Sequence, residues 1–261
     1  MDINPIMEVA TDAAYQSAQV LQNYLGGSYE IRKKSEKDLV TAADTASESV
    51  IRRTIAGTFP QHSILAEESG LHTGRPDCTW IVDPLDGTTN FAHQLGVFCI
   101  SIAFAYKGAI VAGVVLNPVS GELFTAAAHR GAQLNGQPIR VSATAHISES
   151  LLATGFPYDK VAHMDILMAR FRAFLGACQG MRRMGSAALD LCFLACGRFD
   201  GYWEQNLKPW DTAAGMLIVN EAGGRVSDFS DQSFDIGKKE ILASNGRIHE
   251  AMLAVLKPDD Q

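Results

Sequence analysis

Residues 83–91 read Asp-Pro-Leu-Asp-Gly-Thr-Thr-Asn-Phe, and they are the most informative stretch of the chain. The four residues before them, Thr-Trp-Ile-Val at 79–82, are an apolar run of β-type residues, which predicts a buried strand that ends at Asp83. Pro84 has no N–H group, so we expect it to end strand pairing and to turn the chain outward. Gly87 then permits a tight turn into a helix, whose first backbone N–H groups would be free to bind an anion such as phosphate.

Two carboxylates, Asp83 and Asp86, lie three residues apart just before this turn. Clustered hard oxygen atoms beside an anion cradle suit Mg²⁺ together with a phosphate ester. The motif taken alone has a second interpretation, a capped loop that carries two solvated acidic side chains.

Two further motifs add acidic residues to this pattern. Glu67 and Glu68 follow the apolar run Ser-Ile-Leu-Ala at 63–66, so they too come at the end of a predicted strand. Residues 210–215 read Trp-Asp-Thr-Ala-Ala-Gly and lead into an apolar helix that ends with Glu-Ala-Gly-Gly at 221–224. The three motifs together are far more specific than any one of them.

This set of motifs resembles that of the inositol monophosphatase family of metal-dependent phosphatases. The matching segments are Glu-Glu-Ser at 67–69, the nine residues at 83–91, and Trp-Asp-x-Ala-Ala-Gly with its trailing Glu-Ala-Gly-Gly. The resemblance extends from Lys33 to about Asn245, nearly the whole chain. It implies a Mg²⁺-dependent phosphomonoesterase that lithium inhibits.

Composition limits the classes of partner. The chain of 261 residues has a net charge of −7 and no Lys/Arg-rich tract beyond Ile-Arg-Lys-Lys at 31–34. Such a charge gives no support to a direct nucleic-acid footprint or to binding at an anionic membrane. Because an acidic protein repels a phosphorylated substrate, a phosphate site in this chain requires cations.

Cysteine usage and apolar segments indicate the compartment. Five cysteines without a Cys-x-x-Cys pair predict buried free thiols in a reducing environment. The N-terminus lacks the basic start and apolar stretch of a signal peptide. The most apolar segment, 97–116, is interrupted by Ser101, Lys107 and Gly108, so it predicts two strands rather than a membrane span. We therefore expect a cytoplasmic protein, and we expect its seven histidines to be surface or packing residues.

Helical and strand patterns interleave along the chain. The first predicted helix has Asn4 as its cap and Pro5 as its first residue. Residues 97–141 have the short connections of an antiparallel meander. This order indicates α/β structure with mixed sheets (α+β in its antiparallel part). The resemblance implies a layered α-β-α-β-α sandwich of the inositol monophosphatase and fructose-1,6-bisphosphatase type, in a single domain 1–261 that divides at most into subdomains 1–145 and 146–261.

The resemblance also assigns metal ligands to positions of this chain. They are four carboxylates and one backbone carbonyl, namely Glu67, Asp83, Asp86, Asp211 and the carbonyl of Leu85. In this scheme Asp83 bridges two cations, and each subunit binds two or three Mg²⁺. Two such ions roughly 3.5–4 Å apart would stabilise both the attacking and the leaving oxygen. Asp211 has a second interpretation as an ordinary helix N-cap, and Glu68 has one as a solvated or supporting residue.

The attacking water needs a group that takes its proton. The resemblance assigns this task to the hydroxyl of Thr88, hydrogen-bonded to Asp44, beside the metal ligand Glu67. The sequence alone also allows Asp44 to be the cap of the helix that follows it. The backbone N–H groups of Gly87 and Thr88 are expected to hold phosphate oxygens.

The alcohol part of the substrate is assigned to the second half of the chain. In the resemblance Glu204 accepts hydrogen bonds from sugar or inositol hydroxyls, and a helix start beside the ring is formed by Gly185, Ser186 and Ala187. Asp86 and Asp211 are expected to contact the substrate as well. A plain N-cap is the alternative for Ser186. Lys33 matches a loop lysine near a third metal in relatives, with surface solvation as its alternative.

The leading functional hypothesis is hydrolysis of myo-inositol monophosphates. The same chemistry on histidinol phosphate, fructose 1,6-bisphosphate or 3′-phosphoadenosine 5′-phosphate is the alternative. Glu204 favours a polyhydroxy ring, whereas Arg182 and Arg183 could receive a second phosphate. Similarity to bacterial members implies a homodimer, with residues 183–191 near the contact, and a further role with a protein partner in transcription or ribosome assembly.

Overall fold

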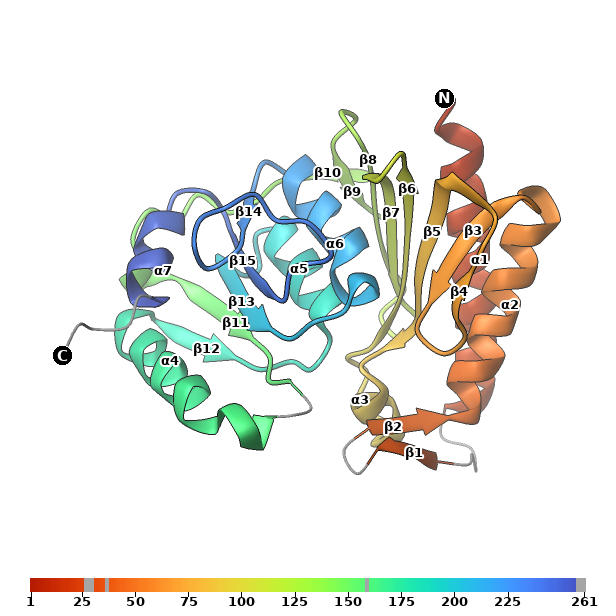
Figure 1. Ribbon diagram of the computed structural model, residues 1–261. Helices are drawn as coiled ribbons and strands as arrows, with labels where there is room; N and C mark the ends of the chain where they lie inside the picture. Colours follow the sequence, from red (N-terminus) through yellow and green to blue (C-terminus); the bar gives the residue numbers. More distant parts are fainter. Residues whose placement is uncertain (26–30, 36–37, 158–159, 257–261) are drawn as a thin grey trace.

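The computed structural model describes residues 1–25, 31–35, 38–157 and 160–256; for 31–35, 38–41 and residue 160 it describes the backbone only. Figure 1 shows two β-sheets separated and flanked by pairs of helices. The layers follow one another from right to left in that view: a helix pair, the larger sheet, a second helix pair, the smaller sheet and a third helix pair. The predicted α-β-α-β-α sandwich is therefore confirmed.

The larger sheet has eight strands in the order β10-β9-β8-β7-β6-β5-β3-β4, and among these only β3 and β5 pair in parallel. Its side chains alternate between two faces, as strand geometry requires. In β6, Ile100, Ile102 and Phe104 pack with the outer helices, whereas Cys99 and Ala103 pack with the central ones. The strands are β3 (His62–Ala66), β4 (Gly70–His72), β5 (Arg75–Asp86), β6 (Cys99–Tyr106), β7 (Ala109–Asn117), β8 (Glu122–Ala127), β9 (Ala132–Leu134) and β10 (Gln137–Ile139).

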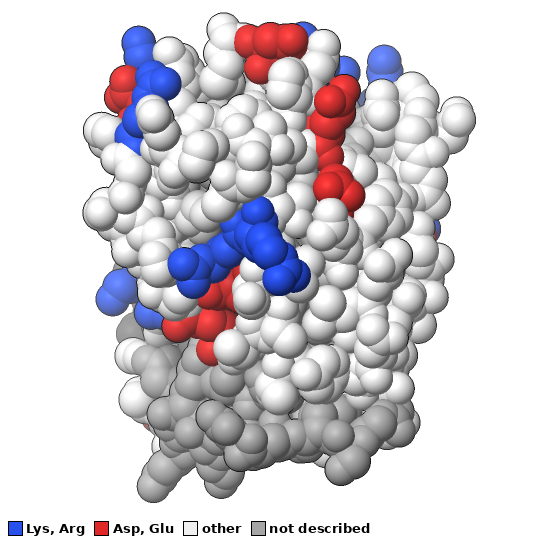
Figure 2. Space-filling model, turned by 90° about the vertical axis from the view of Figure 1, so that its right-hand side faces the viewer, with Lys and Arg blue, Asp and Glu red and all other residues white. Residues whose placement is uncertain are grey.

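The outer face of this sheet is covered by α1 (Asn4–Tyr24) and α2 (Ala42–Thr58). Asn4 was expected to cap α1, but it is the first helical residue, and its N–H donates to Asp2 Oδ1 at 3.1 Å. Figure 2 views the side of the molecule that carries α1 and α2. Among the described residues on that face, Lys and Arg form several separate groups, the central one beside Asp and Glu, rather than an extended basic tract.

The smaller sheet has the order β12-β11-β13-β15-β14, with β11 parallel to both of its neighbours. Its strands are β11 (Leu151–Thr154), β12 (Gly180–Arg182), β13 (Gly201–Gln205), β14 (Arg225–Ser227) and β15 (Glu240–Ser244). Its outer face packs on α4 (Met164–Ala177) and α7 (His249–Leu256), where Phe174, Trp203 and Met252 are buried together. Shorter elements are β1 (Ile31–Ser35), β2 (Asp38–Thr41), η1 (Ile147–Glu149), η2 (Lys160–His163) and α3 (Thr88–Ala92).

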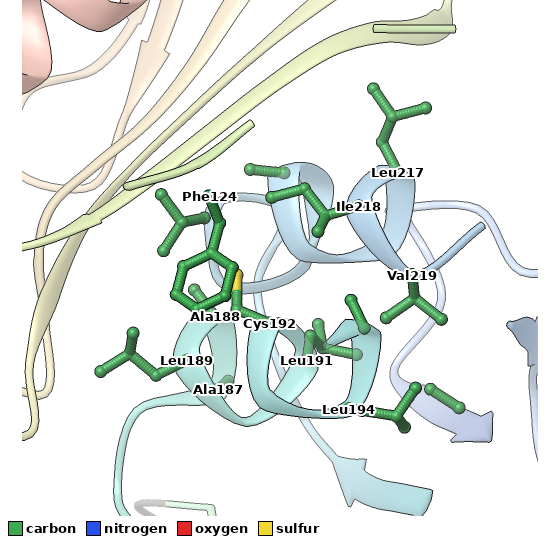
Figure 3. Packing of buried hydrophobic residues seen from close by; sticks show 14 of the residues in the cluster. Phe124, Ala187, Ala188, Leu189, Leu191, Cys192, Leu194, Leu217, Ile218 and Val219 are labelled. Atoms are coloured by element: carbon green, nitrogen blue, oxygen red, sulfur yellow. The ribbon is translucent and has the colours of Figure 1, made fainter. Parts of the chain in front are cut away.

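The central layer consists of α5 (Ala187–Ala195) and α6 (Pro209–Glu221), which lie between the two sheets. Figure 3 shows Phe124 of the larger sheet beside Cys192 of α5, in a cluster that also contains Leu191 of α5 and Leu217 and Ile218 of α6. A helix buried on nearly all sides must be apolar all round. Because α5 and α6 are buried between the two sheets, their N-terminal ends are held in place.

Two details differ from the predicted elements. Pro84 does not end its strand, because β5 continues to Asp86, where pairing with Cys99 resumes after a register shift. The proline thus produces a bulge in β5, which is where prolines are tolerated inside sheets. Strands β2 and β4 were not predicted, whereas the meander at 97–141 is confirmed.

Other predictions concern thiols, histidines and membranes. All five cysteines are free, and His249 is a packing residue whose ring bonds Ser227 at 2.9 Å and Ser244 at 2.8 Å. Within the described ranges, no helix combines the length and the apolar character that a bilayer crossing demands. The cytoplasmic location and the subdomain boundary near 145 stay predictions.

Candidate active site

A pocket of about 620 Å³ opens where the turn after β5 faces the starts of α5 and α6, a volume typical of small-molecule sites. Every residue predicted for the site except Asp44 lines this pocket. They are Glu67, Asp83, Leu85, Asp86, Gly87, Thr88, Gly185, Ser186, Ala187, Glu204 and Asp211. Residues that are separated by almost 150 positions therefore meet at one cavity.

The turn after β5 is held by local hydrogen bonds. Asp83 Oδ1 accepts the Leu85 N–H at 2.9 Å, and the Thr88 hydroxyl donates to the Leu85 carbonyl at 3.0 Å. Gly87 has φ +96°, a left-handed conformation that a residue with a Cβ adopts only with strain. The first N–H groups of α3 have no acceptor within that helix, so they are available to an anion in the pocket.

Asp86 is fixed by residues from the other half of the chain. Its Oδ2 accepts the Ser186 hydroxyl at 2.7 Å and the Ala188 N–H at 2.8 Å. Ser186 is also the N-cap of α5, because its hydroxyl oxygen accepts the Leu189 N–H at 3.4 Å. The capping alternative for Ser186 is therefore confirmed as one of its roles. Burial raises the pKa of Asp86, and the bonds from Ser186 and Ala188 offset part of that rise.

Asp211 enters the pocket from the first turn of α6. It is not the N-cap, which is Lys208; it is the third helical residue, and its Oδ2 accepts the Lys208 N–H at 2.7 Å. The simple capping explanation is therefore wrong in position, although Asp211 does satisfy one N–H at the helix start. Burial raises the pKa of Asp211 well above its ordinary value, and the charge of Asp86 adds to the effect.

The acidic side chains repel one another in this pocket. Burial raises the pKa of Asp83 well above its ordinary value, and the charges of Glu67, Asp86, Asp211 and Asp44 raise it further. A set of carboxylates with this much mutual repulsion is stable in ionised form only if cations lie among them. Because all the donors are hard oxygens, the set suits Mg²⁺ rather than a thiophilic metal.

In the part of the chain that the structure describes, no three His, Cys, Asp or Glu side chains yet form a group that could hold a metal ion. Asp83, Asp86 and Asp211 each use one oxygen to accept a protein N–H or O–H donor. Each of these carboxylates keeps a second oxygen. The donor set therefore fits Mg²⁺ by chemistry and charge.

Two residues lie differently from their predicted arrangement. Asp44 is buried in the first turn of α2 and is not its cap, since α2 begins at Ala42. The Thr88 hydroxyl donates to Leu85 and so does not make the bond to Asp44 that the resemblance implies. Asp44 nevertheless lies near enough to Asp83 for its negative charge to raise the pKa of that carboxyl group. The Lys33 side chain lies outside the described residues.

Glu204 of β13 lines the same pocket as the metal-ligand candidates. It is 7% exposed, and the Tyr202 hydroxyl donates to its Oε2 at 2.5 Å. Burial raises the pKa of Glu204 to about 7, although the Tyr202 bond and the charge of Arg183 oppose the rise. The wall also contains residues that sequence reasoning did not select, namely Thr89, Gly155, Phe156, Pro157, Asn206, Leu207, Lys208 and Trp210. Arg183, considered before only for a second phosphate, lines the pocket too.

Comparison with known proteins gives concordant matches. The model of the inositol monophosphatase family matches residues 2–259. An inositol-1-monophosphatase of Synechocystis sp. is 45% identical, over 100% of this chain and 91% of the relative. The Nus factor SuhB of Escherichia coli K12 is 42% identical, over 98% of this chain and 97% of the relative. The solved inositol monophosphatase of Anabaena (Nostoc) sp. superposes with a TM-score of 0.90 at 44% identity, covering 98% of this chain and 96% of that one.

Proposed function

Since this chain belongs to the inositol monophosphatase family, we infer that it is a phosphomonoesterase that hydrolyses myo-inositol monophosphates to inositol and phosphate. One observation carries the proposal: carboxylates from β5 and α6, with Glu67 just after β3, line a single pocket that Glu204 of β13 also lines. The first group suits cations and a phosphate, and the second suits neutral hydroxyl groups.

We propose that Mg²⁺, two or three ions per subunit, is held by Glu67, Asp83, Asp86, Asp211 and the carbonyl of Leu85. When bound, Mg²⁺ would lower the pKa of a coordinated water and neutralise charge on the phosphoryl group. The repulsion that raises the pKa of Asp83 supports this assignment, because a cation relieves it.

The chain's own groups then position the reactants. Backbone N–H groups of Gly87 and Thr88 hold phosphate oxygens at the start of α3. The Thr88 hydroxyl donates its hydrogen bond to the Leu85 carbonyl, so its oxygen remains available to accept a hydrogen bond from the attacking water. Asp44 takes up the proton, directly or through Glu67, and Glu204 binds ring hydroxyls together with the turn at Gly185, Ser186 and Ala187.

The decisive experiment measures phosphate release from inositol 1-phosphate in Mg²⁺. We expect turnover by the wild type and a loss of at least about 100-fold in Asp86→Asn, since that carboxylate is both ligand and hydrogen-bond acceptor. The matched control is Asp228→Asn, which changes an acid that bonds Lys238 in a turn away from the pocket. A wild-type protein that released no phosphate from any monoester in Mg²⁺ would refute the proposal.

A substrate panel tests the finer assignment. Fructose 1,6-bisphosphate and 3′-phosphoadenosine 5′-phosphate should be poorer substrates than inositol 1-phosphate, because the buried carboxylate of Glu204 would repel their second phosphate. Histidinol phosphate should be poorer too, because it has no hydroxyl groups to donate to Glu204. Lithium is expected to inhibit, as the family resemblance implies.

A second role with a protein partner in transcription or ribosome assembly is proposed beside catalysis, since the E. coli relative is named a Nus factor. We also propose a homodimer. Exposed apolar side chains on α4, namely Met164, Ile166, Met168 and Leu175, support an interface there. The segment 183–191 contributes little surface, because residues 186–191 are buried inside the protomer. Sedimentation equilibrium distinguishes one chain from two.

A further inference from the structure

The carboxylate of Glu204 is confined from two sides by residues that have no assigned role. Glu204 and Tyr202 are two positions apart on β13, so their side chains leave the same face of the strand. This geometry lets the Tyr202 hydroxyl reach Glu204 Oε2. Tyr202 is completely buried, so its hydroxyl has no access to bulk water. Moving Glu204 away would leave a buried donor unsatisfied, which is unfavourable.

Gly155 confines the carboxylate from the neighbouring strand. Parallel pairing puts Ala153 beside Tyr202 and Thr154 beside Trp203, which brings Gly155 next to Glu204. The Thr154 hydroxyl, which donates to the Trp203 carbonyl at 2.8 Å, fixes this register at its last pair. A Cβ at position 155 would lie 2.0 Å from Glu204 Oε2 and 2.2 Å from both Cδ and Oε1. The carboxylate therefore occupies the space that any other residue at 155 would fill.

The loop that contains Gly155 is itself anchored. The ring of Phe156, which also lines the pocket, packs edge-on against Phe171 of α4 with centroids 5.9 Å apart. The carboxylate cannot escape by a shift of the strand end alone, because that end is fixed by Thr154 on one side and Phe156 on the other.

We propose that Gly155 and Tyr202 are positioning residues that orient the Glu204 carboxylate and thereby set the preference of the pocket for alcohols with neighbouring hydroxyl groups. The inference rests on the proposed phosphatase function and names the residues that control its substrate class. Tyr202 is not among the residues that line the pocket, and Gly155 lines it beside Glu204, so both act on the alcohol through Glu204.

The test compares two substrates for each variant. Inositol 1-phosphate has hydroxyl groups next to its ester, and p-nitrophenyl phosphate has none. The selectivity is the ratio of kcat/KM for the first substrate to kcat/KM for the second. Tyr202→Phe, which removes a single oxygen, should lower the selectivity about 10-fold, mainly through KM for inositol 1-phosphate. Gly155→Ala should lower it by about 10- to 100-fold, because it displaces the whole carboxylate.

Matched controls separate this effect from general damage. Gly176→Ala adds the same methyl group on α4, where no atom lies within 4 Å, and Tyr106→Phe removes a hydroxyl at the far end of β6. Both should keep wild-type selectivity.

Glu204→Ala provides the sharpest readout. Removing the carboxylate makes room for a Cβ at 155, so Gly155→Ala should have no further effect on selectivity in that background, and the double variant should unfold at a higher temperature than Gly155→Ala. Additive losses in the double variant, or wild-type selectivity in both Gly155→Ala and Tyr202→Phe, would overturn the inference while the phosphatase function stands. A wild-type protein inactive on both substrates would instead overturn the function itself.

Discussion

Gly87→Ala is the change that tests most directly how the turn after β5 is built. Gly87 has φ +96° and ψ 34°, and an alanine in the left-handed region costs about 1–2 kcal/mol. Its Cβ would lie 2.9 Å from the Val97 carbonyl oxygen and 3.1 Å from Phe98 Cβ, atoms that move only with the backbone. The Val97 carbonyl accepts Asn90 Nδ2 at 2.7 Å, and losing that bond costs a further 0.5–1.5 kcal/mol or so. We therefore expect Gly87→Ala to lower the free energy of unfolding by about 1.5–3.5 kcal/mol.

Gly108→Ala is the matched control for this prediction. Gly108 has φ +83° in the β6–β7 turn, but nothing lies within 4 Å of its added Cβ, so only the conformational cost of about 1–2 kcal/mol applies. Urea denaturation followed by circular dichroism measures both values. Hydrolysis of inositol 1-phosphate should fall about 100-fold in Gly87→Ala, because the N–H groups that we propose to bind phosphate move, and should not change in Gly108→Ala. Equal destabilisation of the two variants, or full activity in Gly87→Ala, would show that the contacts of this turn are not what holds it.

Three further predictions concern charge and packing. The pKa of Glu204 is raised from 4.5 to about 7, so its contribution to stability is complete below pH 4.5 and disappears as the pH rises through 7. In Glu204→Gln the free energy of unfolding should therefore vary with pH by about 3 kcal/mol less than in the wild type. Urea titrations across that pH range measure the difference. In EDTA, Asp83→Asn should raise the midpoint of thermal unfolding, because it removes a buried charge that faces Glu67, Asp86 and Asp211. The same substitution should abolish Mg²⁺-dependent activity. A lower midpoint in EDTA would contradict the argument that these carboxylates repel one another. Phe104→Ala should destabilise the protein by about 3–5 kcal/mol in urea denaturation, since its buried ring packs 4.9 Å from that of Trp80; a loss below about 1 kcal/mol would mean that the site collapses around the cavity.

The sequence predicts most elements of this fold because most of them have strong local signals. The meander at 97–141 has Gly-containing turns between alternating apolar residues, and its strands form as predicted. The errors occur where tertiary contacts override a local rule. Pro84 has the local character of a strand end, but β5 can accommodate it as a bulge because Asp86 pairs with Cys99 beyond it. Asn4 is a different case, because the contact is local: its N–H donates to Asp2, two positions earlier, and Asn4 becomes the first helical residue.

The site was predictable as a set of residues, but its contacts were not. Motifs select Asp83, Asp86 and Asp211 because each is embedded in an unusual neighbourhood of Pro, Gly or Trp. Gly155 has no such neighbourhood, and its importance depends on a parallel register between strands about fifty residues apart. The same is true of the bond from Thr88 to Leu85, since a hydroxyl chooses among acceptors that only the folded turn brings near.

The hydrogen bonds of Asp86 decide which part of the chain is the functional unit. Asp86 belongs to the first half, and Cys99 of that half is a donor at 3.8 Å, but the two short bonds to Asp86 come from Ser186 and Ala188 at the start of α5, 100 and 102 positions further along. Asn90 bridges the same two segments, because its Nδ2 donates to Val97 at 2.7 Å and to the Met184 carbonyl at 2.8 Å. A fragment that ended near residue 145 would retain Asp83 and Asp86, but it would lose the donors that stabilise ionised Asp86 and would lose Asp211 entirely. The proposed division at 145 therefore runs through the pocket, and the proposed metal site requires both sides of it.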